Sequence, residues 1–240
     1  MSSINEIPNE LLSIIFSYVE SSDIMNLMCT CRGYFSFVTY SKTKEQLTAL
    51  FVNYFIPCNE NKLTLKLIPH IDVSYKNNLP IMKAIQHGKN EIIERLIKNG
   101  VDLNLNNSKA LELAIIDNRY EIAKLLLEKG ADPNINNGEA LNLAVRGNHY
   151  ELAELLLENN TDINVNIGRA LFWAAEKGNY EIVALLLKWG ADPNLDSRSL
   201  LWAAGNGNYE ITKLLLENKA DPDSYHGEAL KMAVEEGHYF

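Results

Sequence analysis

Histidine and cysteine are the side chains whose spacing most often reveals a catalytic or metal-binding site, and this chain has few of either. The three cysteines, Cys29, Cys31 and Cys58, form no C-x-x-C pair. H-E-x-x-H, G-x-x-x-x-G-K and G-x-S-x-G are absent. We therefore predict that the protein is not an enzyme and expect no catalytic residue, metal site or cofactor. The five histidines lie without metal-ligand spacing at His70, His87, His149, His226 and His238.

One recurring position could instead support binding. Six alanines recur 30, 30, 30, 29 and 30 residues apart, and tryptophan or methionine precedes the last three of them. Both side chains are favoured anchors in protein interfaces. An apolar stripe would equally result from packing between neighbouring helices, so the sequence leaves a binding groove and a core open. The alanines are Ala84, Ala114, Ala144, Ala174, Ala203 and Ala233. We predict that a target contacts the residues just before these alanines, together with some of their polar and apolar neighbours. The predicted set is Leu113, Leu143, Phe172, Trp173, Leu201, Trp202, Arg146 and Lys177.

Two helices in each repeat must position these residues. The first carries apolar residues at helical spacing, for example Leu111, Ala114 and Ile115. The second begins at a tyrosine such as Tyr120 and ends near Gly130. Neither helix can bury its apolar face alone, so the units must stack into an all-α solenoid. Left-handed helix ends are predicted where a Gly or Asn follows the first helix, at Asn118, Asn148, Gly178 and Gly207.

The second half of each unit carries a specific motif. E-I-x-x-L-L-L-x-x-G-A-D-P-N is matched at 121–134 and 181–194. It resembles the ankyrin repeat, although residues 109–114 depart from the T-P-L-H-x-A pattern of that family. Ankyrin units usually span about 33 residues, and the shortage here falls between Asp132 and Leu141. We therefore expect shortened loops where ankyrins project hairpins. The resemblance also implies that the first helices line a concave, target-binding face.

Residues 4–40 break the repeat and form their own amphipathic pattern. Pro8 and Glu10 suit the first turn of a helix. Leu11, Ile15 and Phe16 fall on one apolar stripe of that helix. Asp23 then suits the N-cap of a second helix, and a third element follows from residue 30. The segment predicts three short helices.

This segment resembles an F-box, whose pattern is roughly L-P-x-E-L-L-x-x-I-F-S-Y-L, a short spacer, D-L and V-C-R-x-W. Departures are Ile7, Val19, and Tyr34 or Phe35 in place of the tryptophan. The resemblance implies docking onto the Skp-type adaptor of a cullin–RING ubiquitin ligase by helix-in-groove recognition. Alternatively, the three helices only cap the solenoid. The adaptor-facing residues that the resemblance implies are Ile7, Pro8, Leu11, Leu12, Ile15, Phe16, Val19, Leu27 and Cys31.

These patterns divide the chain into three parts. Residues 1–42 are the F-box-like module, and residues 80–240 hold about five full ankyrin units plus a terminal first helix. Residues 43–79 are predicted to be a helical bridge with a degenerate leading repeat, because Asp72 lies 30 residues before Asp102. The sequence leaves open whether Phe240 is the natural C-terminus.

Charge and composition narrow the classes of partner and compartment. The formal net charge is −9 and the isoelectric point about 5.1, which disfavours nucleic acid and anionic membranes. Few cysteines and no apolar leader or long apolar run favour the cytoplasm, with the nucleus as a further option.

Two functional hypotheses follow. In the first, the protein is the substrate-recognition subunit of an SCF-type cullin–RING ubiquitin ligase, which holds an unidentified target protein on its ankyrin groove. In the second, it is an ankyrin scaffold or inhibitor outside the ubiquitin system. Proteins of this build resemble those of large DNA viruses and intracellular bacteria, and the resemblance would then place the chain in the host cytoplasm, in a host–virus interaction.

Overall fold

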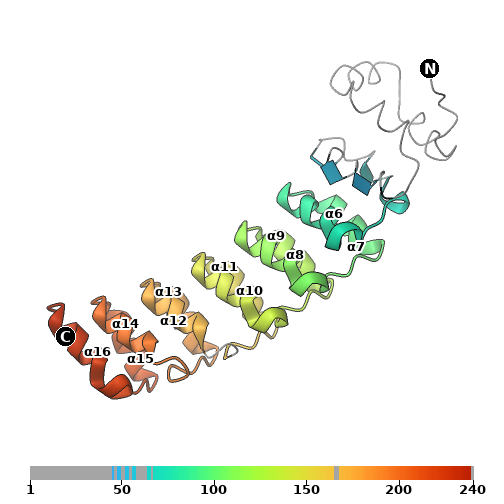
Figure 1. Ribbon diagram of the computed structural model, residues 1–240. Coiled ribbons are helices and arrows are strands. Elements are labelled where there is room, and N and C mark those ends of the chain that lie inside the picture. Colours follow the sequence, from blue (N-terminus) through green and yellow to red (C-terminus); the bar gives the residue numbers. More distant parts are fainter. Residues whose placement is uncertain are drawn as a thin grey trace, which may run out of the picture. The chain divides into compact units, whose positions relative to one another are not determined.

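The regular structure of the described residues is helical throughout (Figure 1). The computed structural model describes residues 67–164 and 168–238, together with residues 45, 48–49, 52–53, 56–57 and 64–65. The chain divides into two compact units, residues 1–106 and 107–240, which are described separately below. Within the described residues, no helix combines the length and apolar character needed to cross a bilayer.

In the first unit, a short 3₁₀-helix leads into a pair of α-helices. The 3₁₀-helix η3 spans Ile68–His70, α6 spans Tyr75–Gln86 and α7 spans Asn90–Lys98. The Thr48 hydroxyl accepts a 2.8 Å hydrogen bond from the Asp72 backbone N–H, so Thr48 is tied to the turn that follows η3. Apolar side chains of the pair are fully buried and form its core, among them Ile81, Ile85, Ile92, Ile93 and Leu96.

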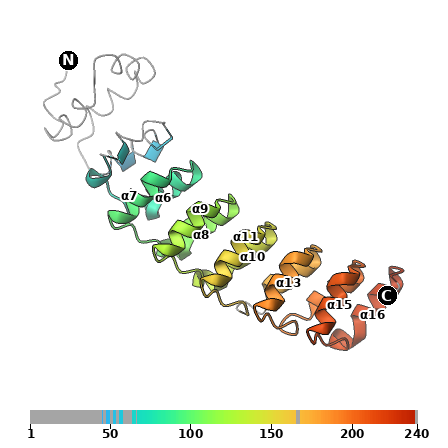
Figure 2. The ribbon, with the colours of Figure 1, turned by 180° about the vertical axis from the view of Figure 1, so that it is seen from behind.

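The second unit consists of helix pairs in two layers. Successive first helices pack on one another (α10 on α12, α12 on α14, α14 on α16), and so do the second helices α9, α11, α13 and α15. Figure 2 shows the second layer from behind. The bounds are α8 Leu105–Ile116, α9 Tyr120–Glu128, α10 Ile135–Arg146, α11 Tyr150–Glu158, α12 Arg169–Glu176, α13 Tyr180–Lys188, α14 Arg198–Gly205, α15 Tyr209–Glu217 and α16 Ser224–Glu235.

Small and branched residues at fixed repeat positions make the core of this unit. The aligned alanines Ala144, Ala174 and Ala203 have no exposed surface, and a buried leucine lies three residues before each of them. Burial of these apolar side chains in every repeat supplies the main stabilisation, because an isolated helix of eight to twelve residues is marginal in water.

The predicted left-handed helix ends are confirmed. Asn118, Asn148, Gly178 and Gly207 have φ values of 50°, 57°, 72° and 70°. After α8, the backbone N–H of Arg119 donates to the Ala114 carbonyl at 2.8 Å, which satisfies a terminal acceptor and reverses the chain.

The shortened loops are also confirmed, and their backbone is unusual. Asn136, Asn137 and Gly138 take left-handed φ values of 58°, 55° and 66° before the right-handed part of α10 starts. Residues 76–78 and 225–227 repeat this turn before the right-handed parts of α6 and α16. At these three places a left-handed turn therefore replaces the hairpin that other ankyrin units project. Asparagine tolerates this conformation better than most residues.

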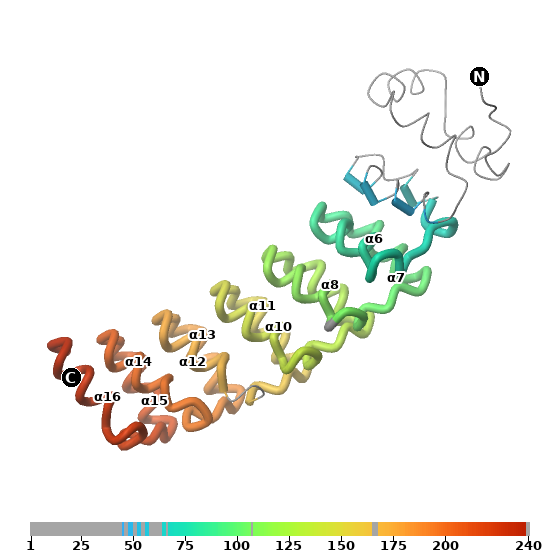
Figure 3. The backbone as a smooth tube through the Cα atoms, viewed as in Figure 1, coloured from blue at the N-terminus to red at the C-terminus, as the bar shows by residue number. Residues whose placement is uncertain are grey.

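Figure 3 traces the backbone from one repeat to the next. Asparagine side chains join the turns that follow the second helices to one another. The Asn194 amide donates to the Lys219 carbonyl at 2.9 Å and accepts from the Asp221 N–H at 2.8 Å. Asn134 and Asn164 make the same pair of bonds to the turn that follows them. Within each turn, the aspartate two residues earlier accepts from the backbone N–H of the asparagine, as Asp192 does at 2.9 Å. This asparagine ladder holds the first helices in a constant register.

Candidate protein-binding surface

The predicted target-binding residues lie mainly on the first helices of the second unit. Leu113 of α8, Leu143 of α10 and Trp173 of α12 are half-buried, as is Leu201 of α14. Trp202 of α14 is 36% exposed. Leu113, Leu143, Trp173 and Trp202 are each followed in the sequence by a fully buried alanine. This row of four side chains therefore lies at the boundary between the core and solvent. Each side chain of this row is therefore partly packed and partly accessible, which agrees with either arrangement that the sequence left open.

An aromatic and cationic cluster lies at the centre of this face. The rings of Phe172 and Trp173 are 4.9 Å apart between centroids, tilted by 49°. The Arg146 guanidinium of α10 lies 5.1 Å from the Trp173 ring centroid, in cation–π geometry. Phe172 is only 6% exposed, so it supports Trp173 from below and offers little surface to a partner.

A second arginine lies over the same aromatic pair but is already engaged. The Arg198 guanidinium lies 4.3 Å from the Phe172 centroid. It donates to both carboxylate oxygens of the buried Asp196, at 2.8 Å from Nε and 2.6 Å from Nη2. The pKa of Arg198 is raised, first by this hydrogen bond and also by the charge of Asp196, while burial opposes the shift.

The Asp196–Arg198 pair also accounts for the 29-residue repeat. Before α14 the left-handed turn is missing, because Ser197 takes a right-handed φ of −62°. The Asp196 side chain instead accepts the Arg198 backbone N–H at 3.2 Å. The chain therefore needs one residue fewer before α14 than before the first helices that begin with a left-handed turn.

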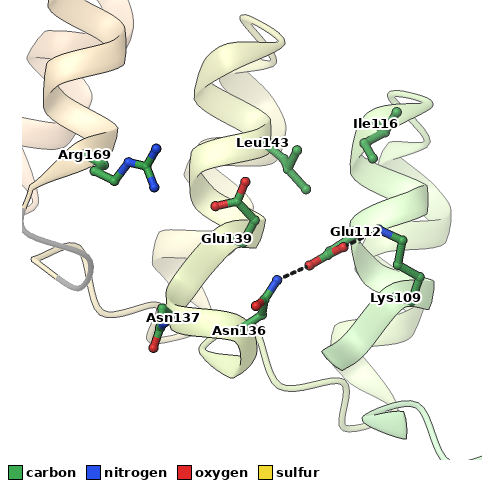
Figure 4. A pocket seen from close by; sticks show the side chains of 8 residues that line it. All are labelled: Lys109, Glu112, Ile116, Asn136, Asn137, Glu139, Leu143 and Arg169. Carbon is green, nitrogen blue, oxygen red and sulfur yellow. Dashed lines mark hydrogen bonds and ion pairs between the residues drawn. The ribbon is translucent and has the colours of Figure 1, made fainter. Parts of the chain in front are cut away.

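A polar hollow of about 470 Å³ lies beside the aromatic cluster, between α8 and α10 (Figure 4). Glu112 is only 5% exposed, and its carboxylate accepts from Lys109 Nζ at 2.7 Å and from the Asn136 amide at 2.9 Å. Ile116 and Leu143 form its apolar wall. The other lining residues are Asn137, Glu139 and Arg169, and Arg169 extends from α12 toward Glu139.

The structure thus brings Arg146, Trp173 and Trp202 onto one face, with the predicted Lys177 exposed just beyond α12. The hollow was not predicted from the sequence. The signal in the sequence was Glu112, the one carboxylate two residues before an aligned alanine. The other repeats carry Met82, Asn142, Phe172, Leu201 and Lys231 at this position. The predicted adaptor-facing residues between Ile7 and Cys31 lie outside the described residues.

No group of three or more histidine, cysteine, aspartate or glutamate side chains is placed to hold a metal ion within the described part of the chain. The arrangement offers hydrogen bonds, cation–π contacts and apolar surface. These are means of recognition.

Comparison with known families identifies the repeats. A family model described as ankyrin repeats (3 copies) matches residues 50–137, 135–197 and 171–240, which together cover most of the chain. The chain belongs to the ankyrin-repeat family. The described ankyrin repeats are therefore short members of that family, with left-handed turns in place of hairpins at residues 76–78, 136–138 and 225–227.

The segment that precedes the ankyrin repeats matches a second model. Residues 4–41 match a family model described as F-box-like, so the predicted N-terminal module is confirmed at the level of sequence. The chain thus combines an F-box-like domain with ankyrin repeats, which is the domain composition of an F-box protein with a protein-binding ankyrin domain.

The crystal structure of the ankyrin repeat domain of Bcl-3, described as a unique member of the IkappaB protein family, is similar in fold. It aligns with a TM-score of 0.60 at 24% identity, over 74% of this chain and 87% of that one. At this identity the likeness shows the ankyrin fold alone. Among curated proteins, none matches the sequence.

Proposed function

We propose that this protein is the substrate-recognition subunit of an SCF-type cullin–RING ubiquitin ligase. Residues 4–41 bind a Skp-type adaptor, and the ankyrin repeats hold a target protein. The observation that carries the proposal is the presence of an F-box-like segment and an ankyrin surface in one chain.

The proposed role is non-catalytic. By holding the target and the ligase together, the chain raises the effective concentration of target lysines near the recruited ubiquitin-conjugating enzyme. Two features of the repeats suit it: the asparagine ladder fixes the register of the first helices, and Trp173 and Trp202 present apolar surface on one face. The proposal assigns the protein to the cytoplasm or the nucleus.

Titration with a purified Skp-type adaptor tests the proposal. The full chain is compared with a Leu11→Asp/Phe16→Asp variant, which places two charges on the predicted apolar stripe. We expect adaptor binding by the wild-type chain and at least a hundredfold loss in the variant, because an unpaired charge buried in an apolar interface costs several kcal/mol.

Trp202→Ala is the matched control, since it alters the ankyrin face and should leave adaptor affinity unchanged. Circular dichroism verifies that each variant keeps its helices. A folded wild-type chain that does not bind the adaptor would overturn the ubiquitin-ligase proposal and leave an ankyrin scaffold or inhibitor, in which the N-terminal helices cap the solenoid.

A further inference from the structure

The Arg146 guanidinium is held in place but has unused hydrogen-bonding capacity. It lies 5.1 Å from the Trp173 ring centroid, and its side chain is exposed. Arg198 in the same cluster differs, because Asp196 occupies it with two charge-assisted hydrogen bonds. A planar guanidinium already ordered on an aromatic ring loses little rotamer freedom when it takes a carboxylate in bidentate geometry.

Arg146 is an exposed cation on a chain that is strongly acidic. Arg169 and Lys177 of the next repeat lie on exposed positions of the same face, while the whole protein has a formal net charge of −9. An exposed cation selects an anionic group in its partner and disfavours a basic side chain at the same place.

An apolar anchor position lies one repeat beyond Trp173 and two repeats beyond Arg146. Trp202 occupies the same repeat position as Trp173 and is the more exposed of the two, with Leu201 half-buried beside it. Glu176 at the end of α12 is close enough to Arg198 to contribute to the rise in the pKa of that arginine. This carboxylate lies in the repeat between Arg146 and Trp202 and disfavours a second acidic side chain near Trp202.

The geometry points to a partner of defined chemistry: we infer that this face binds an extended peptide segment with an aspartate or glutamate at Arg146 and a bulky apolar side chain at Trp202. Neighbouring helices lie about 8–10 Å apart, and an extended chain advances about 3.3 Å per residue. Two such spacings separate α10 from α14, about 16–20 Å, and the Arg146 guanidinium reaches part of the way by lying over Trp173 of α12. The acidic and the apolar residue should therefore be about three to six positions apart. The inference deepens the proposed function, because it rests on the ankyrin face being the target-binding surface.

The adjacent hollow adds no charge preference. Lys109 and Arg169 balance Glu112 and Glu139 there, so it suits the backbone or an uncharged polar side chain of the same segment. The charge selectivity of the face is therefore assigned to Arg146 alone, which makes it testable at one residue.

Selection from a phage-displayed library of random dodecapeptides on the full-length protein tests the inference. We expect enriched peptides to share an acidic residue three to six positions from Leu, Ile, Met, Phe, Tyr or Trp. Synthetic versions should bind Arg146→Gln and Trp202→Ala about tenfold to a hundredfold more weakly, as loss of a charge-assisted contact or an aromatic anchor predicts. Lys188→Gln removes an exposed cation from the other helix layer and should bind like the wild type.

Charge reversal gives a second measurement. Selection on Arg146→Glu should replace the acidic residue of the motif with lysine or arginine and retain the apolar one. Enriched peptides without an acidic residue, equal binding by Arg146→Gln, or no enrichment at all would overturn the inference. Titration of the same preparation with the Skp-type adaptor reports separately on the proposed function, so the failure of either proposal can be told from the failure of the other.

Discussion

Replacing Asn194 with alanine should loosen the coupling between two repeats. The change removes a 2.9 Å hydrogen bond to the Lys219 carbonyl and a 2.8 Å bond from the Asp221 N–H. A hydrogen bond contributes about 0.5–1.5 kcal/mol net, and both of these lie at exposed turns where water can replace the lost partner. We therefore expect a loss of about 1–2 kcal/mol in the free energy of unfolding.

Asp223 provides the matched control for this prediction. It takes the position of Asn194 in the last described turn, and its backbone N–H donates to Asp221 in the same way, at 3.0 Å. Because the described residues contain no equivalent turn of a further repeat for it to bond, Asp223→Ala should leave stability unchanged within experimental error. The asparagines of the ladder would then matter because they connect repeats and not because they form their own turn.

Urea denaturation followed by tryptophan fluorescence measures the loss. Hydrogen exchange locates it, since the Asp221 amide and the helices α15 and α16 should exchange faster in Asn194→Ala than in the wild type. Equal stability of Asn194→Ala and Asp223→Ala, or faster exchange spread evenly over the chain, would refute the role assigned to the ladder.

Two further predictions concern residues at equivalent repeat positions. Leu200 is 4% exposed and Leu230 is 70% exposed. Leu200→Ala should therefore lower the free energy of unfolding by about 2–5 kcal/mol, and Leu230→Ala by less than about 0.5 kcal/mol. Similar losses for the two variants in denaturation experiments would contradict the described burial. Asn137 has a φ of 55° and Ser197 a φ of −62°. Asn137→Val should therefore lower the free energy of unfolding by about 1–2 kcal/mol, whereas Ser197→Val should change it little. Thermal melts that rank the two variants in the opposite order would exclude the left-handed turn.

The repeat architecture was predictable from local pattern. A fixed spacing of alanines and a recurrent L-L-L motif determine two amphipathic helices per unit, and such helices bury their apolar faces only by stacking. The left-handed ends at Asn118 and Gly178 were predictable for the same reason, because the chain must reverse between two helices at a residue that tolerates positive φ. The missing residues of each unit likewise indicated short loops.

What replaces the hairpins was not predictable. The role of Asn194 depends on an atom pair 25 or more residues away, and the sequence shows only that an asparagine recurs there. The Asp196–Arg198 pair is similar, since a one-residue deletion reveals a shortened unit but not the ion pair that stabilises it.

The binding face shows the same division between sequence and tertiary structure. The sequence by itself determined that Trp173 and Trp202 occupy one helical position in successive repeats. Only the tertiary structure decided that Arg146 lies over Trp173, that Phe172 is buried beneath this pair and that Glu112 borders a polar hollow. The physical reason is that helical periodicity fixes which side of a helix a residue occupies, whereas its neighbours and exposure depend on how adjacent repeats pack.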